Sequence, residues 1–136
     1  MTKTFVIIKP DAVAGGLIGD ILARYERAGL RVEAMDLRTI DGAFADQHYA
    51  EHLERDFYPP LREFMTAGPL VAAVVAGEDA IGKVRELNGA TDPAAAEAGT
   101  IRADHGASVR ENCVHGSDGE GSATREIELW FPGLAG

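Results

Sequence analysis

Residues 112–118 are the part of the sequence best suited to chemistry. His115 ends a short apolar run and precedes Gly116 and Ser117, small residues that leave open space and offer backbone or hydroxyl donors. Glu126 falls in the next predicted helix, from which it could fold back to accept a hydrogen bond from one imidazole nitrogen. Such a bond fixes the tautomer and leaves the other nitrogen as a nucleophile. The same pattern also fits a core histidine satisfied by the backbone, so the run alone leaves both interpretations open.

Phosphate-binding loop motifs do not occur in this sequence. Gly15, Gly16 and Gly19 are not followed by the lysine of a Gly-x-x-x-x-Gly-Lys-Ser/Thr loop, and Gly-x-Gly-x-x-Gly does not occur. A phosphate site would therefore be built from side chains. Lys9 ends the first predicted strand and could present its ammonium group at the edge of the sheet. A solvated lysine at a strand end is the alternative interpretation.

Two other residue patterns suggest different chemistry. His48-Tyr49-Ala50-Glu51-His52 matches the His-x-x-Glu-His string of inverted zinc metallopeptidases, in which two histidines on one helical face bind zinc. A five-residue string also occurs by chance, and no helix offers an obvious third ligand. Cys113 could act as a nucleophile beside His115, although a small buried side chain in a strand is the simpler interpretation.

Composition limits the classes of function. The 136 residues carry a formal net charge of −9, which argues against a nucleic-acid-binding surface because such surfaces neutralise many phosphates with Lys and Arg. No apolar stretch approaches the roughly 20 residues of a membrane span. The N-terminus leads straight into a strand-like run, so no signal peptide is expected. The single cysteine cannot form an internal disulfide, and we expect a cytoplasmic protein.

Apolar patterning along the chain predicts alternating strands and helices. The predicted strands are residues 4–9, 30–40, 70–76 and 113–115, and the predicted helices are 17–25, 44–53, 59–65, 78–87 and 122–129. Residues 90–109 show little periodicity and are expected to form a long loop, which in a small domain is usually either functional or disordered. This order predicts one α+β domain over residues 1–136. Its expected architecture is a ferredoxin-like βαββαβ sandwich, a four-stranded antiparallel sheet with helices packed over one face.

Several short motifs together resemble the nucleoside diphosphate kinase family, in order and at the spacing of that family. They are Lys9-Pro10-Asp11, Gly68-Pro69, Thr91-Asp92-Pro93, Gly99-Thr100-Ile101-Arg102 and residues 112–118, and they continue with Glu126 and Leu129-Trp130-Phe131. The resemblance covers essentially the whole chain. It implies a ping-pong reaction in which His115 takes the γ-phosphate of a nucleoside triphosphate and passes it to a nucleoside diphosphate.

The same resemblance implies roles for the other site residues. Glu126 and Ser117 would orient His115. Phosphates would be contacted by Lys9, Tyr49, Arg85, Thr91 and Arg102; the base by Phe57, Val109 and Leu61; and the sugar by Lys9 and Asn112. The cofactor would be Mg²⁺, held mainly by the nucleotide phosphates rather than by protein ligands. The partners would be nucleoside di- and triphosphates, and neither nucleic acid nor a membrane is expected.

Four positions depart from the family pattern: Gly15, Asp56, His105 and Gly119. None is an implied catalytic residue, so they bear on loop packing and assembly. The resemblance implies a homo-oligomer, with a hexamer ranked ahead of a tetramer or dimer. An alternative function is a non-catalytic nucleotide-sensing domain on the same sandwich, in which His115 is structural and no phosphoenzyme forms.

Overall fold

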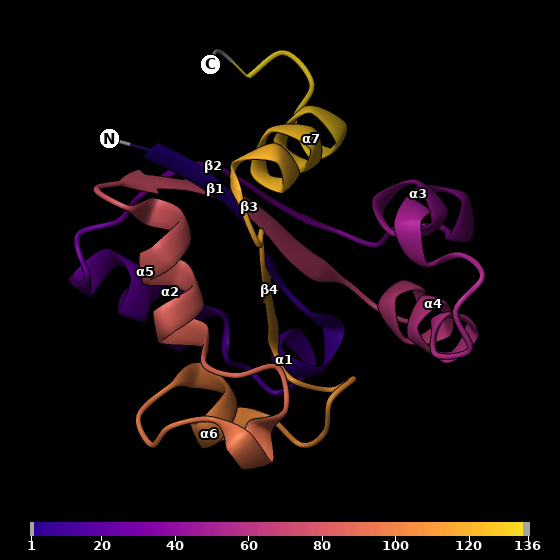
Figure 1. Cartoon of the computed structure of the whole chain (residues 1–136), viewed down its shortest axis with the longest axis horizontal. Helices are drawn as coiled ribbons and strands as arrows, with labels where there is room; N and C mark the ends of the chain where they lie inside the picture. Colours follow the sequence, from indigo (N-terminus) through magenta and orange to yellow (C-terminus); the bar gives the residue numbers. More distant parts are fainter. Residues whose placement is uncertain (1, 135–136) are drawn as a thin grey trace.

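The structure is a computed structural model that describes residues 2–134, and its centre is a four-stranded sheet (Figure 1). The strands are β1 (Thr2–Ile8), β2 (Arg31–Arg38), β3 (Leu70–Gly77) and β4 (Val114–Gly116). They lie in the order β2-β3-β1-β4, and every neighbouring pair is antiparallel. This topology confirms the predicted ferredoxin-like sandwich. Helices cover both faces of the two central strands, β1 and β3, which explains their nearly continuous apolar sequences.

The first face of the sheet carries one hydrophobic core. Val6, Ile8 and Val75 are among the strand residues that point to this side. The helices α1 (Pro10–Ala14), α2 (Ile18–Arg27) and α5 (Ala80–Asn88) cover this core, and a short helix that begins at Ile101 adds that one buried side chain. Buried Ile21 and Tyr25 recur with helical spacing on α2, as their sequence pattern predicted.

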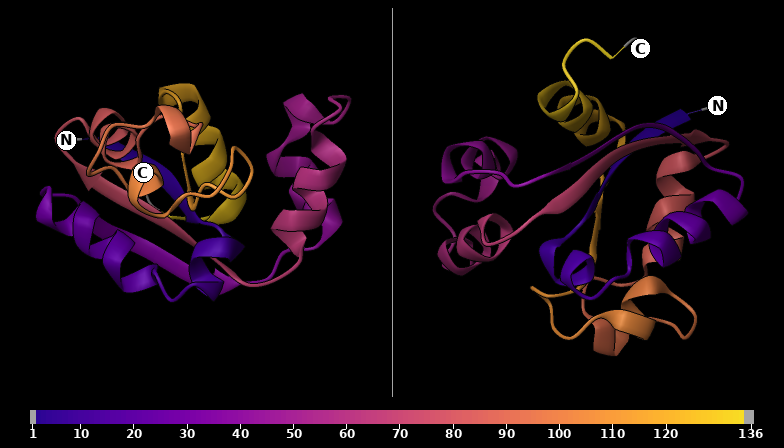
Figure 2. Two further views of the ribbon diagram at one scale, coloured as in Figure 1. Left: turned by 90° about the horizontal axis from the view of Figure 1, so that it is seen from below. Right: turned by 180° about the vertical axis from the view of Figure 1, so that it is seen from behind.

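The second face carries a separate core, so the prediction of helices over one face was wrong. Phe5 and Ile7 point to this side of β1 and pack with Trp130. The elements here are α3 (Gly42–His48), the 3₁₀ turn Ala50–His52, α4 (Tyr58–Thr66) and α7 (Glu120–Trp130). Figure 2 shows α3 and α4 standing together as a hairpin beside the sheet, apart from α2 and α5. Period-2 alternation in β1 sends apolar side chains to both faces, and both must be covered.

Some predicted boundaries were wrong, and each has a local cause. The expected loop of residues 90–109 contains a 3₁₀ turn, Pro93–Ala95, and a short helix α6 (Ile101–His105). Thr100 caps α6 by accepting a hydrogen bond from the Ala103 N–H. The last strand starts at Val114 rather than Cys113, because Cys113 adopts a left-handed φ of 76°. No helix within the described part of the chain is long and apolar enough to cross a membrane.

Candidate active site

The pairing of β4 with β1 determines the direction in which His115 points. His115 lies opposite Ile7, whose side chain belongs to the second core, whereas Val114 lies opposite Ile8 of the first core. His115 therefore projects toward α7 and α3. Its ring lies 6.1 Å from that of Phe5, and its side chain is partly exposed to a cleft.

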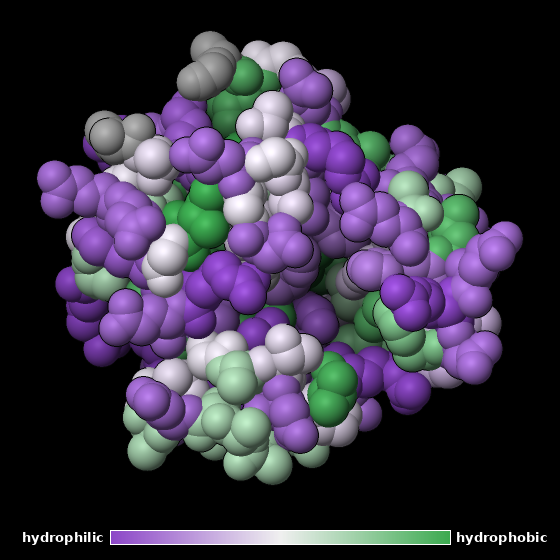
Figure 3. All heavy atoms as spheres, viewed as in Figure 1, coloured by the Kyte–Doolittle hydropathy of each residue, from purple (hydrophilic) through white to green (hydrophobic). Residues whose placement is uncertain are grey.

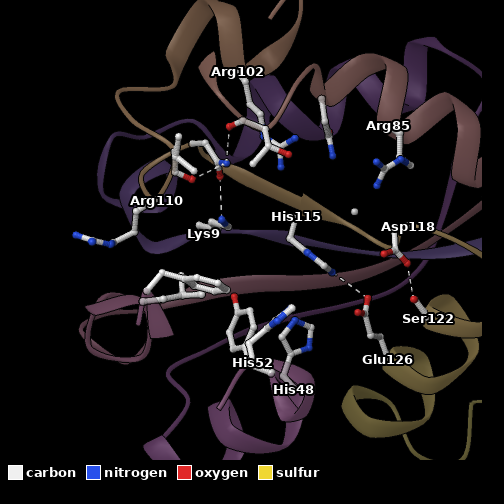
Figure 4. Close-up of a pocket in the computed structure, with 18 of the residues that line it drawn as sticks. Lys9, His48, His52, Arg85, Arg102, Arg110, His115, Asp118, Ser122 and Glu126 are labelled. Atoms are coloured by element: carbon white, nitrogen blue, oxygen red, sulfur yellow. Dashed lines mark hydrogen bonds and ion pairs between the residues drawn. The ribbon is translucent and has the colours of Figure 1, made fainter. Parts of the chain in front are cut away.

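Glu126 of α7 accepts two hydrogen bonds through one oxygen. Its Oε1 lies 2.9 Å from His115 Nε2 (Figure 4). The same oxygen accepts a 2.6 Å hydrogen bond from Ser117 Oγ. Burial alone would raise the pKa of Glu126, but the hydrogen bond and charge of His115, with Ser117, lower it below its usual value. The carboxylate is therefore ionised. An ionised Oε1 is an acceptor, so His115 carries its proton on Nε2 and has a lone pair on Nδ1.

His48, the last residue of α3, forms a wall of the same site. Its ring meets His115 edge to face, with centroids 5.1 Å apart and planes at 80°. Its Nδ1 accepts a 3.0 Å hydrogen bond from Trp130 Nε1. Burial, followed by the charge of His115, lowers the pKa of His48 to about 3. His48 is therefore neutral and adds no charge beside His115.

A cleft of about 940 Å³ opens in front of His115. In Figure 3 the surface is hollowed at this place, between the α3–α4 hairpin and the segment that carries α6. Eleven of the twelve predicted site residues line the cleft: Lys9, Tyr49, Phe57, Leu61, Arg85, Thr91, Arg102, Val109, Asn112, His115 and Glu126. The twelfth, Ser117, is buried and lies behind Glu126, to which it is hydrogen-bonded. The fold thus brings together residues that are up to 117 positions apart in sequence.

Lys9 occupies the floor of the cleft at the end of β1. Its Nζ donates a 2.8 Å hydrogen bond to Asn112 Oδ1, and only 7 % of the residue is exposed. Burial, reinforced by the positive charge of Arg102, lowers the pKa of Lys9 to about 8. Asn112 is itself held by Thr91 and Val109, whose carbonyls accept from its Nδ2 at 3.0 Å. Lys9 is therefore fixed in position, and an anion would restore its preference for the charged form.

The cleft is basic although the whole chain is acidic. It is lined by five basic and three acidic side chains, against a net charge of −9 for the protein. Arg102 donates to the carbonyls of Gly89 (2.8 Å) and Val114 (2.6 Å), which fixes its guanidinium at the cleft wall. Burial, with the nearby charge of Arg85, lowers the pKa of Arg102, yet arginine remains protonated in proteins. Positive charges gathered in a confined cleft favour a multiply charged anion.

The mouth of the cleft has an apolar character. Phe57 is 51 % exposed and Val109 is 58 % exposed, although both are large hydrophobic residues. Leu61 lies one helical turn beyond Phe57, on α4. Phe57 belongs to the α3–α4 hairpin and Val109 to the segment after α6, so the two come from separate parts of the chain. Exposed apolar side chains at a cleft mouth are typical of a ligand-binding surface.

Several further residues line the cleft, for which the sequence predicted no part in nucleotide binding. They are His48, Glu51, His52, Asn88, Arg110, Asp118, Ser122 and Arg125, together with Gly89, Ala90 and Gly116. Arg125 holds the end of α3 through the carbonyls of Gln47 (3.2 Å) and His48 (2.8 Å). The sequence feature that could have pointed to Arg125 is its position directly before Glu126. The sequence did not reveal, however, where their helix packs.

The two alternative chemistries find no support in the geometry. Helix α3 ends at His48 and His52 lies in a separate 3₁₀ turn, so these histidines do not share a helical face as a zinc pair would require. Cys113 is buried, and burial together with Asp11 raises the pKa of its thiol to about 11. A thiol with that pKa is a poor nucleophile at neutral pH.

Comparison with known proteins identifies the family. A family model described as "Nucleoside diphosphate kinase" matches residues 2–135. Nucleoside diphosphate kinases of a Nocardioides species and of Rhodococcus jostii are 61 % and 59 % identical, with at least 96 % of each chain covered. The crystal structure of the nucleoside diphosphate kinase of Aquifex aeolicus superposes with a TM-score of 0.94 at 41 % identity, covering 97 % of this chain and 96 % of that one. The apo enzyme of Encephalitozoon cuniculi also gives 0.94, at 39 % identity, with 96 % and 89 % covered. This chain therefore belongs to the nucleoside diphosphate kinase family, a family of phosphotransferases.

Proposed function

We propose that this chain transfers the γ-phosphate of a nucleoside triphosphate to a nucleoside diphosphate through His115 as the phosphate carrier. The observation that carries the proposal is the bond between His115 Nε2 and Glu126 Oε1, which directs the free Nδ1 lone pair away from α7. In the first half-reaction Nδ1 bonds to the γ-phosphorus, the bond to the bridging oxygen breaks, and the diphosphate leaves. In the second, a terminal oxygen of another diphosphate attacks the same phosphorus and the P–N bond breaks.

Glu126 and Ser117 act on the nucleophile rather than on the phosphate. As Nδ1 bonds to phosphorus, the imidazole becomes positively charged, and the ionised carboxylate stabilises that charge through Nε2–H. Ser117 donates to the same oxygen and fixes its position. This arrangement is in place before substrate arrives, so little reorganisation is required during transfer.

The other cleft residues position the nucleotide. Arg85, Arg102, Lys9 and Thr91 contact the phosphates. Tyr49 joins them as a hydrogen-bond donor, because burial and the charge of Glu126 raise its pKa above the usual value. Phe57 and Val109 hold the base between them with Leu61 beside it, and Lys9 and Asn112 reach the sugar. Contact with the π-face of a base does not depend on the base's hydrogen-bonding edge, so we expect broad base specificity.

Mg²⁺ is the cofactor that we propose, and the donor set of the cleft suits an ion carried in by the nucleotide. Within residues 2–134, the one group of three ligand atoms close together is His48, His115 and Glu126, with two nitrogen donors. Mg²⁺ prefers oxygen ligands and usually keeps phosphates and water around it. Asp118 is an exposed carboxylate that lines the cleft close in sequence to His115. It is the protein group that we propose to contact the water molecules around the Mg²⁺ ion. When bound, the ion neutralises phosphate charge during transfer.

Assembly as a homo-oligomer, with a hexamer ranked first, is part of the same proposal. The sheet edge supports it: among residues 2–134, β2 pairs with β3 alone, and this strand carries Met35 (56 % exposed) and Leu37 (60 % exposed). An exposed strand edge with large apolar side chains readily pairs with another chain. A cytoplasmic location is proposed from the composition alone.

Steady-state kinetics tests the two-step reaction. Initial rates measured against one nucleotide at several fixed concentrations of the other should give parallel double-reciprocal lines, because the first product leaves before the second substrate binds. Intersecting lines would mean direct transfer in a ternary complex. Absence of transfer would favour the non-catalytic nucleotide-sensing domain.

A further inference from the structure

The carrier histidine lies in a set of side chains that could bind a transition metal. His48, His115 and Glu126 each offer one ligand atom, and these atoms lie within 4.8 Å of one another. They come from three elements, α3, β4 and α7, and they border a cleft that supplies room for a further ligand. Two imidazoles and a carboxylate form a donor set that zinc commonly uses. A metal ion bound there would occupy the imidazole that the reaction needs.

The hydrogen bond from Trp130 opposes such a site. An indole Nε1–H is a donor only, so His48 Nδ1, which it contacts at 3.0 Å, must be the acceptor. A neutral imidazole carries one proton, and in His48 that proton is therefore on Nε2. A ligating nitrogen needs a free lone pair. In His48 the lone pair of Nδ1 accepts the Trp130 hydrogen bond and Nε2 is protonated, so neither ring nitrogen has a free lone pair for a metal ion.

We propose that Trp130 keeps His48 from completing a zinc site with His115 and Glu126, and so keeps the phosphate carrier free of metal. For His48 to bind zinc through Nε2, its proton must move to Nδ1. Two N–H groups would then face each other across the 3.0 Å contact, and the Trp130 donor would be buried without an acceptor. Ligation through Nδ1 instead would displace Trp130 directly. Either route loses the same hydrogen bond.

Trp130 cannot easily move away to relieve this conflict. Only 2 % of the residue is exposed. Phe5 packs against its ring at 5.2 Å, Phe44 meets it edge to face at 4.7 Å, and the Arg38 guanidinium lies over it at 4.7 Å. The indole is therefore fixed by packing, and its N–H stays directed at His48. Without His48, only His115 and Glu126 remain of this group, which is fewer than the three protein ligands of ordinary zinc sites.

Zinc affinity of the nucleotide-free protein tests the proposal. Competition with a chromophoric chelator would compare wild type, Trp130→Phe and the double variant Trp130→Phe/His48→Gln. We expect Trp130→Phe to bind one zinc ion per chain about tenfold more tightly than wild type, because the opposing donor is gone. The double variant should lose that gain. Tyr58→Phe removes a hydroxyl bound to Asp46 on the same hairpin and should leave zinc affinity unchanged.

Equal zinc affinity for wild type and Trp130→Phe would overturn the proposal, as would a double variant that binds as tightly as the single one. Nitrogen NMR of wild type gives a second test that does not depend on the variant folding. It should find His48 with its proton on Nε2, and a proton on Nδ1 would contradict the argument. Zinc binding is measured without turnover, so its outcome does not depend on whether the proposed reaction is correct. Only the consequence, stronger inhibition of Trp130→Phe by zinc, rests on that reaction.

Discussion

At the scale of single residues, one oxygen atom links the side chains of the proposed catalytic group. Glu126 Oε1 accepts from both His115 and Ser117, which fixes the imidazole tautomer and its direction together. On the opposite side of the cleft, Lys9 is buried and hydrogen-bonded to the neutral Asn112. The nearby charge of Asp11 only partly offsets this burial, so a bound phosphate would favour the charged form of Lys9.

The depressed pKa of Lys9 predicts a pH dependence of nucleotide binding. Below about pH 8 the side chain is charged, and above about pH 8 it becomes neutral in the free enzyme. We therefore expect kcat/KM for nucleotides to fall as the pH rises from 8 to 10. In Lys9→Arg, which stays charged over this range, the alkaline fall should disappear even if the rate at pH 7 is lower. A wild-type profile that stays level to pH 10 would show that Lys9 does not titrate there.

At the scale of elements, α5 ends very close to the start of α6. Gly89 terminates α5 with a φ of 87°, and a Cβ atom there would lie 2.5 Å from Thr100 Oγ1, the residue that caps α6. The carbonyl of Gly89 also accepts from Arg102. One glycine therefore contacts the start of the next helix and also Arg102, for which we propose phosphate binding.

Gly89→Ala should lower the free energy of unfolding by about 1–3 kcal/mol, because it adds strain and a steric clash. It should also reduce kcat/KM, since α6 and Arg102 must shift. Gly121→Ala is the matched control: nothing lies within 4 Å of a Cβ at that position in α7. It should raise stability by up to about 1 kcal/mol. Chemical denaturation measures both, and equal effects would refute the packing argument.

Elements with a continuous apolar run or a clear periodicity could be predicted from sequence, whereas elements defined by short-range capping could not. The buried strand at residues 70–76 was found almost to the residue because its apolar run is continuous. Helix α6 was missed because five residues are too few to show a 3.6-residue period, and its only signal is Thr100. The coverage of both faces follows from the alternation within β1, which a continuous apolar run conceals.

At the scale of the whole molecule, the sheet has an exposed apolar edge. Met35 and Leu37 lie opposite Ala73 and Val71 of β3, so they share the face that carries the first core. They are nevertheless more than half exposed. Covering this edge with a second chain would remove apolar surface from water and supply the missing strand neighbour.

The double variant Met35→Glu/Leu37→Glu should therefore reduce the mass of the particle in solution. Light scattering of wild type should give the mass of six 14.4-kDa chains, and the variant should give a smaller species because charged side chains are depleted at the core of interfaces. Leu53→Glu is a control at another exposed apolar residue (47 % exposed) and should leave the mass unchanged. A monomeric wild type would refute the assembly.

The predicted site residues lie close together in the structure, but the contacts that hold them there join parts of the chain that are far apart in sequence. The order and spacing of short motifs pointed to His115, Glu126 and the cleft arginines. The sequence could not reveal that His48 and Trp130 stand behind His115, because this contact joins residues 82 positions apart through the packing of α3 against α7. Likewise, the buried position of Lys9 depends on Asn112, 103 positions away.

The most direct measurement for the central claim is capture of the phosphoenzyme. Incubation with ATP labelled at the γ-phosphate, followed by quenching and hydrolysis, should give label that is stable to alkali and labile to acid, as expected for phosphohistidine. Wild type and His105→Ala should take up label, because His105 lies on α6 and does not line the cleft. His115→Ala should take up none. Label on His115→Ala equal to wild type, or no label on the wild-type protein, would contradict His115 as the phosphate carrier.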